Sequence, residues 1–271
     1  MAEGPVVDPW RELRACTRAR IALGRSGASL PTAGLLEFGL AHARARDAVH
    51  AAVRFEALRE RLVTAGITVI EVHSAAADRE RYLQRPDLGR RLDAHGAARL
   101  DGIELQGRPD VVFVVADGLS AEAVQRHAMP LLSAVLQRMG GAATAAPVVL
   151  AHQARVALGD EIGERLRARQ VVVLIGERPG LSAHDSLGIY LTHEPRIGRS
   201  DAERNCISNV RPEGLAYEAA AARLLSLMAG ARRLGCSGVA LKDESAAGGV
   251  ARLERSLERP SFGLGSEPRA D

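Results

Sequence analysis

The feature that most constrains the fold of this chain is a set of short apolar runs, each ended by a turn and followed by a helical pattern. Residues 171–175 (VVVLI) are the clearest run, and the turn GERPG (176–180) ends it. Similar runs occupy residues 110–115 and 147–151. Continuous β-branched runs of this length are typical of parallel strands that helices bury on both faces. The pattern therefore predicts an α/β fold with a mostly parallel sheet.

Helical patterns alternate with these strands along the second half of the chain. They cover residues 121–139, 160–168 and 213–234, and one more strand is expected at 187–192. Strands that alternate with helices of this length favour a doubly wound arrangement. We therefore expect a Rossmann-like, three-layer α/β/α domain over residues 108–271, with a flexible C-terminal tail.

The sequence of residues 1–107 predicts a separate, mainly helical N-terminal domain. Its longest helical signal covers residues 31–65, where large apolar residues recur at helical spacing and indicate a core-facing side. One strand is expected at 67–72, and a helix at 78–92 is interrupted by a proline. Residues 19–30 predict either a surface connector or an anion-binding nest.

Composition excludes several classes of function. The net charge is only +3 and no cluster of arginines with aromatic residues occurs, so we expect no nucleic-acid partner. No apolar run approaches the roughly 18 residues that a membrane span requires, so we expect no membrane association. Three cysteines without a CxxC pair indicate a reducing, cytoplasmic environment. The eight histidines are scattered, and we expect no metal ligands.

Two turns at strand ends could present polar side chains to a ligand. Asp117 and Ser120 have two interpretations of equal weight. They could contact a ligand, or they could form a βα turn that caps the next helix. No GxGxxG or P-loop sequence is present, which weakens the case for a nucleotide-dependent oxidoreductase. In GERPG, Glu177 could accept hydrogen bonds from amides, and Arg178 could pair with a carboxylate or phosphate. The alternative for these two residues is an ion pair on the surface.

Two further motifs carry less weight. Cys206 has no neighbouring base, so it is either a buried, inert thiol or a packing contact for a large ligand. Asp93-Ala94-His95 begins the DxHxxG motif of one cobalamin class, but Ala98 replaces its glycine and we interpret the match as chance. By residue chemistry alone, the chain is an α/β protein that binds a large, amide-rich or anionic small molecule. No catalytic constellation is visible.

Seven blocks of the sequence carry a resemblance to a known family. They include ALGRSGASLPT (22–32), RYLQRPDLGRRL (81–92), LIGERPGLSAHDSLGIYLTHEPR (174–196) and ERNCISNVRPEGL (203–215). In this order they resemble the small subunit of ethanolamine ammonia-lyase, over nearly the whole chain. The resemblance implies an enzyme that uses adenosylcobalamin, with dimethylbenzimidazole kept on the cobalt (base-on). Homolysis of the cobalt–carbon bond starts a radical conversion of ethanolamine to acetaldehyde and ammonia.

The resemblance also implies a division of roles between two chains. A TIM-barrel large subunit carries the ethanolamine site, and the small subunit helps to enclose the corrin at their interface. Matching motifs assign cobalamin contacts to Val156, Glu177 and Cys206, with no catalytic residue and no metal ligand in this chain. We expect a cytoplasmic hetero-oligomer, and the family leaves a place within a bacterial microcompartment open. The competing interpretation is a stand-alone α/β binding or scaffold protein without the lyase role.

Overall fold

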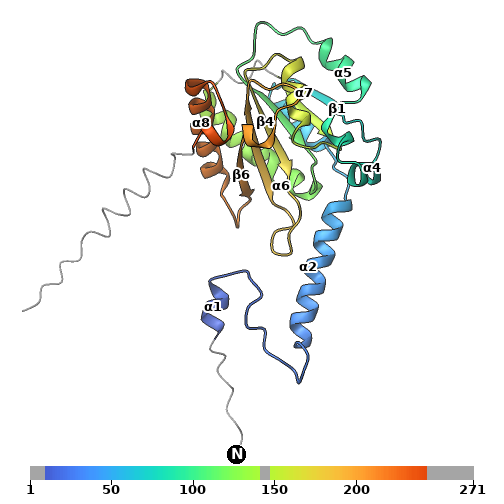
Figure 1. Cartoon of the computed structure of the whole chain (residues 1–271), viewed down its shortest axis with the longest axis vertical. Coiled ribbons are helices and arrows are strands. Elements are labelled where there is room, and N and C mark those ends of the chain that lie inside the picture. Colours follow the sequence, from blue (N-terminus) through green and yellow to red (C-terminus); the bar gives the residue numbers. More distant parts are fainter. Residues whose placement is uncertain (1–9, 141–146, 243–271) are drawn as a thin grey trace, which may run out of the picture.

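A computed structural model describes residues 10–140 and 147–242 of the chain. Its centre is one six-stranded sheet with the strand order β1-β3-β2-β4-β5-β6 (Figure 1). The strands are β1 (Val69–His73), β2 (Val112–Ala116), β3 (Val148–His152), β4 (Gln170–Gly176), β5 (Leu187–His193) and β6 (Arg204–Val210). Every run predicted as a strand is present, and β6 is a strand that the sequence analysis did not predict.

The sheet is parallel on one side and antiparallel on the other. β1, β3, β2 and β4 run parallel, with Val69 opposite Val148 and Val112 opposite Val171. β5 then runs antiparallel to β4, and β6 runs antiparallel to β5. Antiparallel edge strands are common on an otherwise parallel α/β sheet. The prediction of an α/β fold with a mostly parallel sheet is confirmed, whereas its Rossmann-like character stays a prediction.

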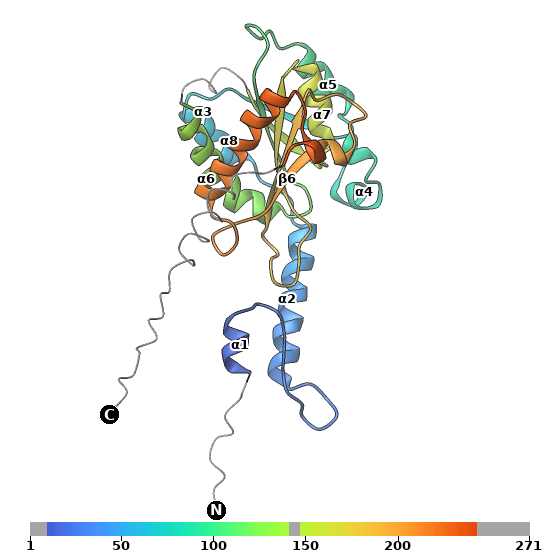
Figure 2. The ribbon, with the colours of Figure 1, turned by 60° about the vertical axis from the view of Figure 1, so that its left-hand side comes forward.

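Helices cover both faces of the sheet, because alternate strand residues point to opposite sides. One face forms a buried cluster with α3 (Glu56–Thr64), α6 (Ala121–Met139) and α8 (Tyr217–Leu234). The other face forms a buried cluster with α5 (Ala94–Asp101) and α7 (Leu158–Arg165). Figure 2 shows α3, α6 and α8 to the left of the sheet and α5 and α7 to the right.

The N-terminal part of the chain contributes to the same sheet. β1 pairs with β3, and Leu62 of α3 is fully buried in the cluster with α6 and α8. The predicted helix at 78–92 is present as α4 (Arg79–Gln84) and the 3-10 helix η1 (Leu88–Arg90), with Pro86 between them. The division into two domains at residue 107 stays a prediction, and the predicted C-terminal tail lies outside the described residues.

The prediction of one continuous helix over residues 31–65 is wrong. The structure has α2 (Thr32–His50), then an extended backbone at Ala51, and then α3. Phe55 immediately precedes α3 and is buried in the cluster beside the sheet. The chain therefore has to leave the axis of α2 in order to bring Phe55 and α3 onto the sheet.

α2 projects away from the sheet, and α1 (Arg11–Ala15) lies at the same end of the molecule (Figures 1 and 2). Ala48 is the one buried residue of α2. Leu35 and Phe38 belong to the apolar pattern that predicted a core-facing side, but they are 58% and 44% exposed. Helical periodicity identified the helix, but the expected burial of its apolar side is not found in this chain.

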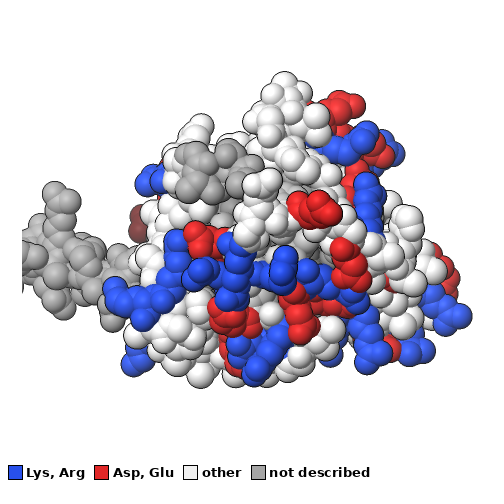
Figure 3. All heavy atoms as spheres, turned by 90° about the horizontal axis from the view of Figure 1, so that it is seen from above, with Lys and Arg blue, Asp and Glu red and all other residues white. Residues whose placement is uncertain are grey.

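The edge where β2 and β4 begin lies at the opposite end from α2. Figure 3 views this end, where Lys and Arg side chains are interspersed with Asp and Glu. Ion pairs such as Arg169–Asp110 (3.4 Å) join residues that lie one or two positions before these two strands. The remaining short helices are η3 (Asp201–Glu203), before β6, and η4 (Gly238–Ala240), after α8. A surface on which positive and negative side chains alternate in this way does not indicate binding of a polyanionic partner.

Candidate functional site

Asp117 and Ser120, at the end of β2, both have structural partners. The buried Asp117 carboxylate accepts hydrogen bonds of 2.8–2.9 Å from three backbone N–H groups, those of Gly118, Gln153 and Ala154. Arg79 Nη1 lies 3.5 Å from the same carboxylate. Ser120 Oγ caps α6 by accepting from Ala123 N at 3.2 Å. Of the two interpretations of this turn, the structure favours the capped βα turn.

Gly176 brings the end of β4 into direct contact with this turn. A Cβ at Gly176 would lie 2.1 Å from Ser120 O and 2.6 Å from Asp117 O. Gly118 has φ +59°, and a Cβ there would lie 2.2 Å from Gly176 O. Leu119 N donates to Gly176 O at 2.9 Å. Glycine is therefore required because two backbone segments meet here.

Glu177 follows and connects the ends of three strands. Its Oε1 accepts from Ser208 Oγ at 2.5 Å, and its Oε2 accepts from Ser186 Oγ and from Asn209 N. Ser186 directly precedes β5, and Ser208 and Asn209 lie at the end of β6. Since all three donors are neutral, a surface ion pair with Arg178 is not what positions this carboxylate. Glu177 is half-buried, so a ligand can still reach its carboxylate.

Val156 and Glu177 line one cavity of about 440 Å³ at the carboxyl ends of the strands. In open α/β sheets, ligands bind at this edge. Val156 lies between β3 and α7 and is half-buried. The other residues of the wall come from five segments: Tyr82, Gly118, Leu119, Arg155, Ile175, Gly176, Arg178 and Tyr190. Two of the three residues that the sequence assigned to a ligand site thus share one cavity.

Two arginines lie over the ring of Tyr82 at this cavity. The Cζ atoms of Arg155 and Arg79 are 4.2 Å and 4.8 Å from the ring centroid. Tyr82 is fully buried and donates from its hydroxyl to Ala154 O at 3.1 Å. Burial raises the pKa of Tyr82, so the hydroxyl remains a donor at neutral pH. Arg155 Nε is buried and has no hydrogen-bond partner among the described residues.

Cys206 lies one strand further along the sheet. It faces Tyr190 across β5 and β6, and Tyr190 itself lines the cavity. The side chain is exposed, so the expectation of a buried thiol is wrong. Desolvation of the sulfur raises the pKa of Cys206, hydrogen bonding with Tyr190 lowers it, and the charge of Glu177 raises it further. With its pKa raised, the thiol stays protonated, which is unfavourable for a nucleophile.

The sequence analysis missed most of the residues that support this site. Tyr82 lies in a block that carried the family resemblance, and Arg155 directly precedes Val156, but nothing in their spacing indicated that their side chains would stack. Ser186 and Ser208 are short polar residues at strand ends, and no local pattern links them to Glu177. Cross-strand pairing of β6, which was not predicted, is what brings Ser208 and Cys206 beside β5.

The DxH segment has a structural role. Asp93 caps α5 by accepting from Gly96 N at 2.6 Å, which agrees with interpreting the DxHxxG match as chance. Over residues 10–140 and 147–242, no three His, Cys, Asp or Glu side chains are grouped so that they could hold a metal ion. The helices in these same ranges include none with the length and apolar character needed to cross a bilayer.

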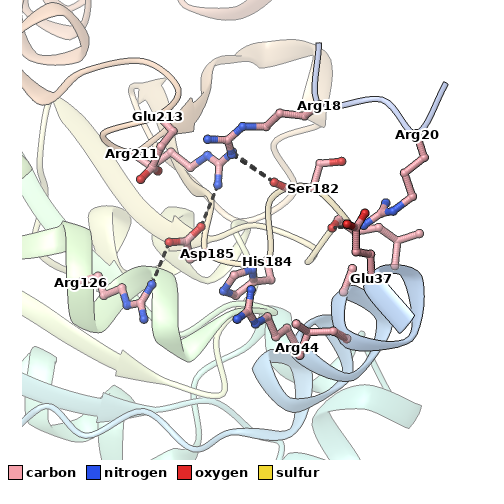
Figure 4. Close-up of a pocket in the computed structure, with 13 residues that line it drawn as sticks. Arg18, Arg20, Glu37, Arg44, Arg126, Ser182, His184, Asp185, Arg211 and Glu213 are labelled. Carbon is pink, nitrogen blue, oxygen red and sulfur yellow. Dashed lines mark hydrogen bonds and ion pairs between the residues drawn. The ribbon is translucent and has the colours of Figure 1, made fainter. Parts of the chain in front are cut away.

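A second cavity, of about 450 Å³, lies between α2, the segment that precedes it and the loop between β4 and β5 (Figure 4). Five arginines line it: Arg18, Arg20, Arg44, Arg126 and Arg211. Asp185 lies among them, 2.9 Å from Arg211 Nη1 and 3.1 Å from Arg126 Nη1. Burial opposes its ionisation, but the hydrogen bond from Arg211 and the charges of neighbouring His and Arg groups lower the pKa of Asp185 overall.

The fold and the first cavity define a class: an α/β protein whose strand ends present a half-buried carboxylate and apolar side chains to a ligand. Residues 7–242 match the family model of the ethanolamine ammonia-lyase light chain. The chain belongs to this family.

Relatives support the same assignment. The ethanolamine ammonia-lyase small subunit of Azotobacter vinelandii is 56% identical over 262 residues, which is 95% of this chain and 96% of the relative. The small subunit of Ralstonia nicotianae is 56% identical over 240 residues, or 87% and 88% of the two chains. That of Pseudomonas syringae pv. tomato is 55% identical over 241 residues, or 88% and 84%. The family that the sequence blocks resembled is thereby confirmed.

Proposed function

We propose that the chain is the small subunit of an ethanolamine ammonia-lyase and that it assembles with a large subunit that carries the ethanolamine site. We also propose that the cavity at the end of β4 forms one wall of an adenosylcobalamin site, with contacts from Val156, Glu177 and Cys206. The observation that supports this site best is spatial. Val156 and Glu177 line one cavity, and Cys206 is the cross-strand partner of Tyr190 in its wall.

The residues at this cavity suit a corrin. A corrin has apolar ring faces and a rim of amide groups, which donate as well as accept hydrogen bonds. Val156 and Tyr190 offer apolar contact, and the Glu177 carboxylate can accept from an amide N–H. Arg155 also lines the cavity, and a guanidinium can donate to an amide carbonyl of the rim.

Adenosylcobalamin, when bound, supplies the radical chemistry, and this chain orients the cofactor and excludes water from one side of it. The family resemblance implies a base-on cofactor, and the interrupted DxHxxG match at Asp93 is compatible with one. The three cysteines are free thiols, which supports a reducing, cytoplasmic location. Microcompartment association and a Rossmann-like classification remain parts of this proposal.

Co-expression with an ethanolamine ammonia-lyase large subunit tests the assignment. We expect the two chains to co-elute on size exclusion, to retain a corrin absorbance spectrum after gel filtration, and to release ammonia from ethanolamine. The purified chain alone should release none. Failure to form a complex or to take up corrin would favour the stand-alone binding protein.

We expect Glu177→Ala to weaken cobalamin retention in the complex by roughly 10-fold or more, because a hydrogen bond to a charged group contributes about 1.5–3 kcal/mol. The substitution also removes the acceptor for Ser186, Ser208 and Asn209. Equilibrium dialysis of the assembled complex against free cobalamin measures the effect, and circular dichroism verifies that the subunit is folded.

Two variants serve as controls for Glu177→Ala. Asp101→Ala removes an exposed ion pair with Arg165 at the end of α5, and should not change cobalamin retention. Cys206→Ser preserves the size and the donor of the side chain, so the expected loss is small. If Glu177→Ala retained cobalamin as well as the wild type does, the role of this carboxylate would be limited to connecting the strands. A complete loss of activity in an assembled, corrin-loaded Cys206→Ser complex would contradict the packing role.

A further inference from the structure

The N-terminal arm, residues 10–50 with α1 and α2, leaves much of its apolar surface uncovered. Twelve large hydrophobic side chains are exposed among the described residues, and seven of them lie on the arm. They are Trp10, Leu13, Leu30, Leu35, Leu36, Phe38 and Leu40. Single exposed apolar residues are ordinary, but a concentration on one projecting element indicates a surface that a partner covers.

The apolar residues of α2 lie on more than one side of the helix. At about 100° per residue, Leu36 and Leu40 point one way, and Leu35 and Phe38 point about 150° away from them. Their side chains are between 44% and 67% exposed. A helix that is apolar on opposite sides is stable when it is enclosed rather than laid on a flat surface. The shape of the uncovered surface therefore requires a partner that surrounds this helix.

The cavity between the arm and the sheet domain carries a surplus of positive charge (Figure 4). Its five arginines are accompanied by three carboxylates, those of Glu37, Asp185 and Glu213. Asp185 is already bound to Arg126 and Arg211. Arg18 donates a hydrogen bond to Ser182 O at 3.4 Å, and Arg20 donates one to Leu181 O at 3.5 Å. Arg20 also lies over the Phe38 ring, with its Cζ 5.9 Å from the ring centroid.

The three arginines that the arm contributes to this cavity have no acidic partner among the described residues. Neither Arg18, Arg20 nor Arg44 forms an ion pair with another described residue, although all three line the cavity. An acidic segment that entered the cavity could form ion pairs with three arginine side chains. A guanidinium can donate two parallel N–H hydrogen bonds to one carboxylate. The cavity thus complements a partner that places acidic side chains next to an apolar surface.

The arm is continuous with the wall proposed for the cofactor. The loop that begins after Glu177 runs through Leu181, Ser182 and Asp185, which line the cavity beside the arm. Glu177 itself lines the cavity proposed for cobalamin. Both surfaces therefore occupy the edge of the sheet where β4 ends. A partner that closes the cofactor site from outside would meet the arm as well.

We propose that the arm is the element that docks this chain on the large subunit. The large subunit encloses the apolar sides of α2 and places an acidic segment in the arginine-lined cavity. This proposal rests on the proposed function, because it takes the large subunit as the partner. A second copy of this chain is the competing occupant, and it is distinguished below.

Two sets of variants of the full-length chain test the docking role in co-expression with an affinity-tagged large subunit. Leu36→Glu combined with Leu40→Glu places charges on one apolar side of α2. We expect it to lower the amount of small subunit retained by about tenfold or more. Arg18→Glu combined with Arg44→Glu should lower retention also, and the loss should become smaller as salt is raised. Ile197→Glu, at a position that is 66% exposed outside the arm, is the matched control and should assemble normally.

The outcomes separate the two proposals. If the wild-type chain fails to bind the large subunit, the proposed function itself is wrong. If the wild type and both arm variants assemble at the same ratio, the arm is not the docking element while the proposed function stands. Light scattering of the chain alone measures self-association. A wild-type dimer that Leu36→Glu/Leu40→Glu converts to a monomer, with binding to the large subunit intact, would assign the arm to a second copy. Unchanged circular dichroism of each variant shows that the substitutions act on the surface.

Discussion

Replacing Gly176 with valine is expected to destabilise the subunit by more than about 3 kcal/mol, the upper part of the range for overpacking a close contact. The Cβ would lie 2.1 Å from Ser120 O, and the nearest atoms are backbone, which no rotamer change can move. The turn after β2 and the end of β4 would have to separate. That movement would break the hydrogen bond from Leu119 N to Gly176 O and displace Glu177. Urea unfolding followed by circular dichroism measures the loss.

Gly180→Ala is the matched control, because it lies in the same turn. A Cβ at Gly180 would meet only Ala183 O, at an ordinary distance of 3.8 Å. We expect its unfolding midpoint to stay close to that of the wild type. Equal midpoints for Gly176→Val and Gly180→Ala would mean that the backbone contact at the end of β4 is not required for stability.

Replacing Asp117 with alanine is expected to cost about 3–5 kcal/mol, the range for removing one partner of a buried ion pair. The side chains of Asp117 and Arg79 are 2% and 13% exposed, so little water reaches the charge that remains. The backbone N–H groups of Gly118, Gln153 and Ala154 would lose their acceptor as well. Since a domain is stabilised by only about 5–15 kcal/mol, the variant should lose a large fraction of its folding free energy.

The yield of soluble protein and the unfolding free energy in urea measure the effect of Asp117→Ala. Asp110→Ala is its control, just before the same strand. Asp110 is 65% exposed and, within the described part of the chain, forms an ion pair only with exposed Arg169, so we expect a change within about 0.5 kcal/mol. A wild-type unfolding free energy in Asp117→Ala would show that the three N–H groups find other acceptors. The turn would then not depend on the carboxylate.

Local patterns predicted the elements of the sheet well where the strands are apolar. β2, β3 and β4 are buried along nearly their whole length, so nearly every residue in them is apolar and contributes to the strand prediction. β6 was missed because only every third residue is buried, beginning with the charged Arg204, and its exposed positions are Cys, Ser and Asn. Its pairing with β5 depends on residues distant in sequence. The helix at α2 was predicted, but its continuation into α3 was not, because burial of Phe55 decides where the chain turns.

The sequence by itself determined the α/β class, the family and the residues expected at the cofactor, because these depend on local runs and on motifs. Only the tertiary structure decided that Glu177 connects β4, β5 and β6, that Gly176 is needed for contact between two backbone segments, and that the apolar residues of α2 remain exposed. Each of these facts depends on atoms brought together across the sheet or left without a neighbour. Spacing along the chain cannot encode them, since a side chain's burial is set by what the rest of the fold places beside it.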